Sequence, residues 1–140
     1  KLDNRYSEFS IVSHSEQSYP SEIIEKATEI PEKCFDVEVI GIDEAQFFDL
    51  DLVDVCQMLA DSGKRVIVAG LDQDYRAKPF EPIPQLLAVA EYISKIQAVC
   101  VICGAPANRT QRVTQEGDRV LVGGKDHYEA RCRLHHIVKD

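Results

Sequence analysis

The sequence predicts an α/β fold, with a parallel sheet flanked by helices and a small metal-binding lobe at the C-terminal end. Two apolar segments of strand length, residues 37–42 and 66–72, each end in acidic residues, and an amphipathic helical segment lies between them. Strand, helix and strand with short links form a βαβ unit, for which we expect a right-handed crossover. Two cysteine and histidine pairs near the C-terminus predict the lobe.

Composition excludes several classes of protein. The 140 residues suffice for one domain, and the hydrophobic fraction of 44% and charged fraction of 29% are typical of globular proteins. The net charge of −8 argues against general nucleic-acid binding, although a small phosphorylated ligand needs only local donors and a cation. No apolar run approaches the roughly 20 residues of a membrane span, and no signal-peptide core is visible. We therefore expect a cytoplasmic protein with no nucleic-acid or membrane partner.

The first helix is predicted to begin at Ser21, which can cap it, and to end at Pro31. Its apolar positions recur at helical spacing: Ile23, Ile24, Ala27 and Ile30. The strand at residues 37–42 follows, and its continuous apolar run predicts burial on both faces.

The second helix is predicted to begin at Asp49 or Asp51 and to end before Gly63, a residue suited to a helix C-terminus. Its apolar stripe is Leu52, Val53, Cys56, Leu59 and Ala60. Cys56, like Cys34, is expected to be a small core residue.

The remaining segments alternate between loops and short elements. Residues 73–84 form a proline-rich loop with aromatic side chains, which is typical of loops that line binding sites. Residues 85–93 predict a third helix and residues 95–102 a third strand. Residues 120–122 predict a short β segment in the lobe.

Asp43 and Glu44 at the end of the first strand are candidate site residues. Adjacent carboxylates repel each other, and the carboxyl ends of parallel strands are where open α/β folds bind ligands. An acid at a strand tip also fits a Walker B pattern, in which Asp holds Mg²⁺. That pattern requires a phosphate loop of the form G-x-x-x-x-G-K-[ST]. Gly124-Lys125 fails this test, because Arg119 replaces the first glycine and Asp126 replaces the Ser or Thr.

The metal-site prediction depends on the spacing of Cys100 with Cys103 and of Cys132 with His135. A C-x-x-C pair and a C-x-x-H pair form a tetrahedral Cys₃His zinc site, and four protein ligands leave no open position for catalysis. His136 is an alternative fourth ligand. The odd total of five cysteines, without a secretory signal, argues against a disulfide framework.

Together these motifs resemble the thymidine kinase family of the cellular, zinc-containing (type II) kind. The matching stretches run in family order: residues 3–7, 42–48, 69–80, 98–104, 109–112 and 128–132. The resemblance implies a RecA-like, P-loop-type nucleotide-binding domain at residues 1–99 and a zinc-anchored lasso lobe at residues 100–140. It implies that the γ-phosphate of ATP passes to the 5′-hydroxyl of thymidine, with deoxyuridine a possible substrate. It further implies Mg²⁺, a structural Zn²⁺, dTTP as feedback inhibitor and a homotetramer.

The resemblance also implies roles for individual residues. Glu44 is the base that takes the 5′-hydroxyl proton, Asp43 belongs to the Mg²⁺ shell, Asp3 is a possible helper, and Arg5 lies near the phosphates. Positions implied around the nucleoside are Phe47, Gln46, Leu71, Tyr75, Phe80, Thr110, Leu121 and Tyr128. Arg112, like Gln46, is a further candidate site residue, and the resemblance implies no specific role for either.

The sequence departs from the family where the glycine-rich phosphate loop should precede Asp3-Asn4-Arg5-Tyr6, and the segments 14–21 and 113–120 look short. We therefore expect the 140 residues to be part of a longer enzyme, and a molecule that began at Lys1 to show no ATP turnover. Two alternatives remain open. One is a helicase-like ATPase fragment, because Asp43-Glu44-Ala45-Gln46 resembles a helicase Walker B box. The other is a non-enzymatic zinc-ribbon interaction module, in which Asp43 and Glu44 merely cap the next helix.

Overall fold

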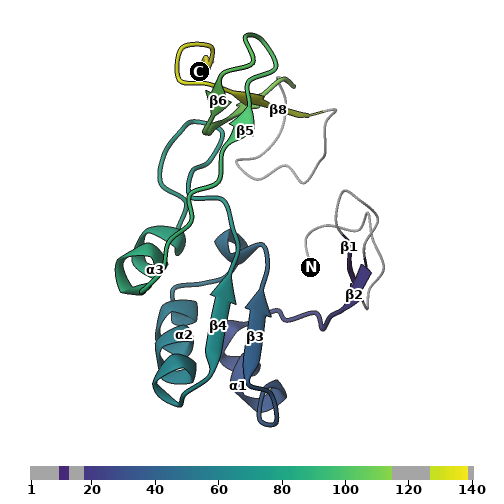
Figure 1. Ribbon diagram of the computed structural model, residues 1–140, viewed down its shortest axis with the longest axis vertical. Coiled ribbons are helices and arrows are strands. Elements are labelled where there is room, and N and C mark those ends of the chain that lie inside the picture. The colour runs from purple at the N-terminus through teal and green to yellow at the C-terminus, as the bar shows by residue number, and fades with distance from the viewer. Residues whose placement is uncertain (1–9, 13–17, 115–126, 139–140) are drawn as a thin grey trace.

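The computed structural model describes residues 10–12, 18–114 and 127–138. Figure 1 shows a βαβ unit at one end of the molecule and a small β lobe at the other. The elements, in chain order, are β1 (Ser10–Val12), β2 (Ser18–Pro20), the 3₁₀ turn η1 (Ala27–Glu29), α1 (Ile30–Lys33), β3 (Val39–Ile42), the 3₁₀ turn η2 (Ala45–Phe47), α2 (Asp51–Asp61), β4 (Arg65–Val68), α3 (Ile83–Val89), β5 (Ala98–Val99), β6 (Pro106–Ala107), β7 (Arg109–Arg112) and β8 (Tyr128–Arg131).

The predicted βαβ unit is present. β3 and β4 pair in parallel, with Ile40 opposite Val66 and Ile42 opposite Val68, and α2 connects them. Both strands are shorter than expected, because β3 begins at Val39 and β4 ends at Val68. The α/β class predicted from the sequence is therefore confirmed.

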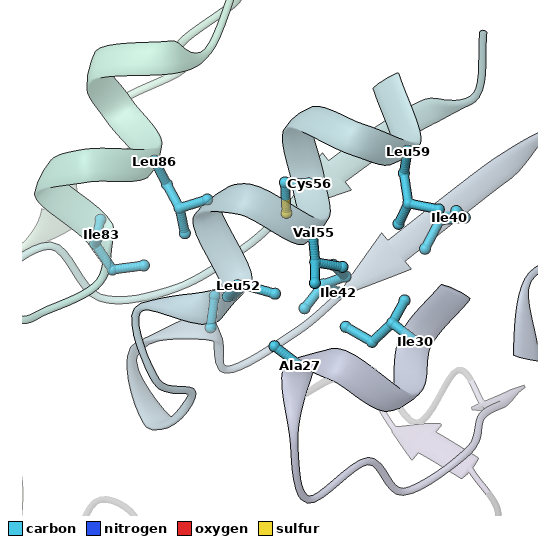
Figure 2. Close-up of a cluster of buried hydrophobic side chains, with 11 residues drawn as sticks. Ala27, Ile30, Ile40, Ile42, Leu52, Val55, Cys56, Leu59, Ile83 and Leu86 are labelled. Atoms are coloured by element: carbon cyan, nitrogen blue, oxygen red, sulfur yellow. The ribbon is translucent and has the colours of Figure 1, made fainter. Parts of the chain in front are cut away.

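The expectation that the first strand is buried on both faces is wrong for the described residues. Ile40 and Ile42 are buried, whereas Val39 is 58% exposed and its neighbour Ile67 on β4 is 53% exposed. The reason is that α1 and α2 pack on the same face of the two-stranded sheet (Figure 2). An apolar run does not distinguish a strand buried on one face from one buried on both.

The core lies between this sheet face and the helices (Figure 2). Its buried members are Ala27, Ile30, Ile40, Ile42, Ala45, Leu52, Val55, Cys56, Leu59, Ile83 and Leu86. The stripe on α2 includes Val55, which the prediction omitted, whereas Ala60 is exposed. Burial raises the pKa of the Cys56 thiol to about 11, as expected of a neutral core residue, and Cys34 packs against the same core.

The C-terminus of α2 confirms the role predicted for Gly63. Gly63 has a φ of +88°, and its N–H donates to the Ala60 carbonyl at 2.8 Å, while the Lys64 N–H donates to the Leu59 carbonyl at 3.2 Å. These two bonds form a Schellman motif. At the other end of α2 the predicted aspartate cap is absent, because the N-cap is Leu50 without a side-chain hydrogen bond.

Pro31 does not end the first helix, as had been expected. The segment around Ser21 is not helical, and the helical residues are η1 and the single turn α1, in which Pro31 occupies the first turn. Proline is tolerated there because the N–H groups of the first turn have no intrahelical acceptor. Of the periodic apolar residues, Ala27 and Ile30 lie in η1 and α1, whereas Ile23 and Ile24 precede them in a non-helical segment. The helical part is therefore shorter than the spacing predicted.

The expected third strand at residues 95–102 is also wrong. Only Ala98–Val99 is extended, and this strand, β5, pairs antiparallel with β6 of the lobe and not with the main sheet. The Cys100 N–H donates to the Ala105 carbonyl and the Gly104 N–H to the Cys100 carbonyl, so the chain turns at Cys100. The helix predicted at 85–93 is α3, shifted to Ile83–Val89. Residues 120–122 lie outside the described ranges.

In the described part of the lobe, β5 pairs with β6 and β7 pairs with β8, both antiparallel (Figure 1). The β7–β8 pairing continues one step further, where the Val113 N–H donates to the His127 carbonyl at 2.9 Å. No helix in the described part of the chain is long and apolar enough to cross a membrane.

The core makes a prediction for stability. Leu52 is fully buried, so Leu52→Ala should lower the free energy of unfolding by about 2–5 kcal/mol through the lost contacts and the cavity left behind. Met58→Ala on the same helix is the control, because Met58 is half exposed and its truncation should cost less than about 1 kcal/mol. Urea unfolding measures both values, and equal losses would contradict this packing.

Candidate active site and metal centre

The acidic tip of β3 has an unusual backbone. Asp43 and Glu44 follow the last strand residue, and both side chains are exposed. Glu44 is left-handed, with φ +53° and ψ +40°, a conformation that residues other than glycine seldom adopt and that costs on the order of 1 kcal/mol or more. The Glu44 N–H donates to Asp43 Oδ1 at 2.9 Å. A strained residue that carries a carboxylate at a parallel strand end is typical of a functional site.

Backbone hydrogen bonds continue from the sheet into this tip. The Ala69 N–H donates to the Ile42 carbonyl at 2.8 Å, and the Ala45 N–H donates to the Ala69 carbonyl at 3.0 Å. These bonds hold the turn after β3 against the segment after β4. Neither η2 nor α2 has a side-chain cap, so the alternative in which Asp43 and Glu44 cap the next helix is wrong.

Gln46 links the two strand ends. Its side chain is 3% exposed, its Oε1 accepts from the Leu71 N–H at 3.0 Å, and its Nε2 donates to Glu44 Oε2 at 2.5 Å. Gly70 makes room for this amide, because a Cβ at residue 70 would lie 2.9 Å from Gln46 Oε1. Sequence reasoning named Gln46 but missed Gly70, which only the close approach identifies.

Two of the predicted nucleoside residues meet beside this tip. The Phe47 and Phe80 rings pack edge to face, with centroids 6.1 Å apart and planes at 88°. The Phe80 N–H donates to the Asp72 carbonyl at 3.1 Å, which ties the end of the proline-rich loop back to the segment after β4. Asp72 also forms an ion pair with Lys95 at 2.5 Å.

Asp74 shapes the loop between these points, and sequence reasoning missed it. The side chain is 4% exposed, and its Oδ1 accepts from the N–H groups of Arg76 at 2.9 Å and Lys78 at 3.0 Å. An aspartate that accepts from the backbone two residues ahead is an Asx turn. An Asp at the start of a proline-containing loop is the signal that could have identified it.

Contacts between described residues join the lobe to this loop. The Arg109 guanidinium donates to Gln73 Oε1, the Arg112 guanidinium lies 5.1 Å from the Tyr75 ring centroid, and His136 Nε2 lies 2.8 Å from the Tyr75 carbonyl oxygen. Because that carbonyl only accepts, His136 Nε2 carries the proton.

The register of β7 and β8 places further predicted residues on one face. Arg112 is directly opposite Tyr128, and Thr110 is opposite Ala130, so Thr110, Arg112 and Tyr128 share the same side of the pair. Arg112 in turn contacts Tyr75. The structure therefore gathers Tyr75, Thr110 and Tyr128 around Arg112.

Among the described residues, the predicted site residues thus form two groups. Asp43, Glu44, Gln46 and Phe47 lie at the tip of β3 with Leu71 and Phe80, while Tyr75 lies with the lobe residues Thr110 and Tyr128. Asp3, Arg5 and Leu121 lie outside the described residues.

Cys100, Cys103, Cys132 and His135 come together as the sequence predicted, with their ligand atoms all within 4.8 Å of one another. Cys103 Sγ lies 3.8 Å from Cys132 Sγ, and His135 Nδ1 lies 3.3 Å from Cys132 Sγ and 3.8 Å from Cys100 Sγ. A tetrahedral zinc with Zn–S bonds of about 2.3 Å holds its sulfur ligands about 3.8 Å apart. The four residues therefore fit a zinc ion, and His135, not His136, completes the set.

The surroundings of the thiols in this cluster favour binding of a cation. Burial alone raises the pKa of Cys100, but the N–H groups of Cys132, Ile102 and Cys103 point at its sulfur and bring the pKa down to about 6. For Cys103 the Ala105 N–H lowers the pKa, while burial and the sulfur atoms of Cys100 and Cys132 raise it, with a net rise. Crowded sulfur atoms of this kind favour a bound metal, because the cation stabilises every thiolate together.

Gln111 fixes the backbone that follows His136. The Gln111 side chain is buried, and its amide pairs with the backbone of Ile137, accepting from the N–H at 2.8 Å and donating to the carbonyl at 2.9 Å. His136 is therefore held between the ligand His135 and a segment fixed to β7. By class, this is an α/β protein that combines an acidic strand tip with a separate lobe that carries a candidate zinc site.

Comparison with known proteins gives the family within this class. The family described as thymidine kinase matches residues 1–136. A protein named thymidine kinase from Rhodothermus sp. (strain ITI 518) is 56% identical over 133 residues, which cover 95% of this chain and 62% of the relative. The chain belongs to the thymidine kinase family.

Two further relatives carry the same name. The thymidine kinase of Halobacterium salinarum (strain ATCC 29341 / DSM 671 / R1) is 44% identical over 148 residues, covering 99% of this chain and 76% of the relative. That of Bdellovibrio bacteriovorus is 53% identical over 135 residues, covering 96% of this chain and 66% of the relative. The chain thus spans about two thirds of the length of these relatives.

The metal centre makes a prediction with a matched control. Purified, dialysed protein should contain one tightly bound zinc per chain by metal analysis, and His135→Ala should lose most of it. His136→Ala should keep it, because His136 contacts Tyr75 and not the cluster. Absence of zinc from the unaltered protein, or loss through His136→Ala alone, would contradict the assignment.

Proposed function

We propose that the protein carrying this chain is a thymidine kinase, which transfers the γ-phosphate of ATP to the 5′-hydroxyl of thymidine to give dTMP in nucleotide salvage. Family membership and three relatives named thymidine kinase support the activity. The structural observation that carries the proposal is the exposed Glu44 carboxylate, held at the end of a parallel strand by a left-handed turn and by Gln46.

The proposed chemistry assigns different roles to the two acids. Phosphoryl transfer depends mainly on positioning and on neutralising charge, and a base orients the nucleophile and takes its proton. Glu44 accepts the proton of the 5′-hydroxyl, and Asp43 helps to hold Mg²⁺, with Asp3 and Arg5 on the phosphate side. Mg²⁺, when bound, neutralises the phosphate oxygens during transfer.

The proposed nucleoside residues are apolar or aromatic where they lie near Glu44. Phe47 and Phe80 supply an edge-to-face aromatic pair, and Leu71 is half exposed although its N–H is fixed by Gln46. Apolar surface that stays open beside a strained carboxylate suits a flat base and a sugar. Tyr75, Thr110, Leu121 and Tyr128 contribute from the loop and the lobe, whereas Gln46, which the resemblance placed around the nucleoside, is buried and donates to Glu44.

The remaining assignments belong to the same proposal. We divide the chain into a RecA-like, P-loop-type nucleotide-binding domain at residues 1–99 and a lasso lobe at residues 100–140. The pairing of β5 with β6 supports a lobe that begins two residues earlier. The zinc is structural, ATP is the donor, dTTP acts as feedback inhibitor, and the enzyme is a cytoplasmic homotetramer.

No feature of the described residues favours the helicase-like alternative. Its distinguishing test is stimulation of ATP hydrolysis by nucleic acid, and the family match makes thymidine the expected acceptor instead. Thymidine-dependent, nucleic-acid-independent formation of ADP is the outcome that this proposal requires.

Glu44→Gln tests the proposed base in the full-length protein. This variant should bind thymidine with unchanged affinity, while kcat falls by about 10²-fold or more, the usual scale for loss of a general base. Glu38→Gln is the matched control, because Glu38 is an exposed acid at the opposite end of the same strand and should leave kcat unchanged. Steady-state kinetics and isothermal titration with thymidine measure both variants. Near-normal turnover in Glu44→Gln would remove Glu44 from the role.

A further inference from the structure

We propose that Gln46 is the positioning residue for Glu44 and acts on the reaction without contacting the nucleoside. This inference rests on the proposed function, because it presumes that Glu44 is the base. Gln46 connects a fixed backbone group at the end of β4 to the carboxylate at the end of β3.

The orientation of the Gln46 amide follows from its partners. The Leu71 N–H can only donate, so the amide atom that faces it must be the oxygen. The NH₂ group is thereby directed at Glu44 Oε2, to which it donates at 2.5 Å. A flipped amide would place two donors against each other at Leu71 and two acceptors against each other at Glu44.

The surroundings of Gln46 keep it in this position. The side chain is almost completely buried, and Gly70 is the reason that it fits, because a Cβ there would meet Gln46 Oε1 and Ile83 Cδ1, each at 2.9 Å. Ile83 belongs to the core, so the amide lies between the strand end and packed apolar atoms. The Gln46 amide is therefore a rigid donor.

Glu44 needs such a donor because nothing else in the described chain holds its carboxylate. The side chain is exposed, and a free Glu would distribute over many rotamers and lose its alignment with a nucleophile. Gln46 engages Oε2 only, and Oε1 accepts no hydrogen bond from the described residues. One oxygen is thus anchored while the other is left for the substrate hydroxyl.

The local sequence explains why residue 46 can reach residue 44. The 3₁₀ turn η2 begins directly after Glu44 and folds the chain back, with the Phe47 N–H donating to the Glu44 carbonyl at 3.0 Å. The left-handed Glu44 then directs its side chain to the same side as the buried amide. The strained backbone of Glu44 and the burial of Gln46 together place the Glu44 carboxylate beside the Gln46 amide.

Two variants of the full-length protein separate the parts of this link. Gln46→Met keeps the volume but removes both donor and acceptor. Gln46→Glu keeps an acceptor for the Leu71 N–H but turns a second carboxylate toward Glu44. Both should lower kcat by about 10-fold or more, because misplacement of a reacting group by about 1 Å can cost as much as about 10²-fold, while KM for thymidine changes less than about 3-fold. Gln57→Met on the exposed face of α2 is the control and should leave both constants unchanged.

A double-mutant cycle gives a readout that a purely structural role would not show. In the Glu44→Gln background, Gln46→Met should lower the residual kcat no further, because the group that it positions has already gone. Equal losses in both backgrounds, or a rise in KM with kcat unchanged, would overturn the proposal in favour of a role in folding or in nucleoside contact.

Crystal structures of the wild-type protein and of Gln46→Met test the link independently of activity. The Glu44 carboxylate should leave its wild-type position in the variant, and an unmoved carboxylate would overturn the positioning role even if kcat falls. Failure of the proposed function is seen elsewhere, as absence of thymidine phosphorylation by the wild-type protein.

Discussion

Parallel pairing of β3 with β4 determines where the described residues around Glu44 lie. The pairing ends both strands at one edge, and two further backbone bonds, from Ala69 to Ile42 and from Ala45 to Ala69, carry it into the turn. Glu44 is left-handed because the chain must turn there without losing these bonds, and Gln46 can reach Leu71 for the same reason. The carboxylate is therefore positioned through Gln46, whose own place is fixed by its bond to the segment after β4.

The candidate metal cluster positions the second group of site residues, which lies in the lobe and at Tyr75. It joins a turn at Cys100 to one at Cys132, which closes the ends of the β lobe, and it fixes the chain up to His135. His136 and Arg112 then hold Tyr75, while Arg109 holds Gln73. In the described chain the cluster does not contact Glu44 directly. Through these lobe residues it holds the proline-rich loop, and Phe80 in that loop packs against Phe47 near Glu44. The core of the described residues contains no lobe residue, so disruption of the cluster should affect the lobe before it affects the core.

Short sequence patterns correctly predicted those features of the structure that depend mainly on the residues within each pattern. The βαβ unit followed from apolar segments of different period, Gly63 from the needs of a helix C-terminus, and the Cys₃His cluster from ligand spacing. The wrong predictions concern features that depend on contacts between residues far apart in the sequence. Burial of one sheet face depends on which helices cover it, and the apolar run at residues 95–102 joined the lobe because Cys100 turns there. The position of Gln46 beneath Glu44 needs Gly70 and Leu71, which are more than 20 residues away in the sequence.

In the proposed reaction, the carboxylate of Glu44 faces the hydroxyl that receives the phosphate. A crystal structure of the full-length protein with thymidine, Mg²⁺ and a non-hydrolysable ATP analogue is the decisive measurement. We expect Glu44 Oε1 within hydrogen-bond distance of the thymidine 5′-oxygen, about 2.6–3.2 Å, while Oε2 keeps its bond to Gln46. A 5′-hydroxyl bound by another residue, with Glu44 directed away from it, would exclude Glu44 as the base.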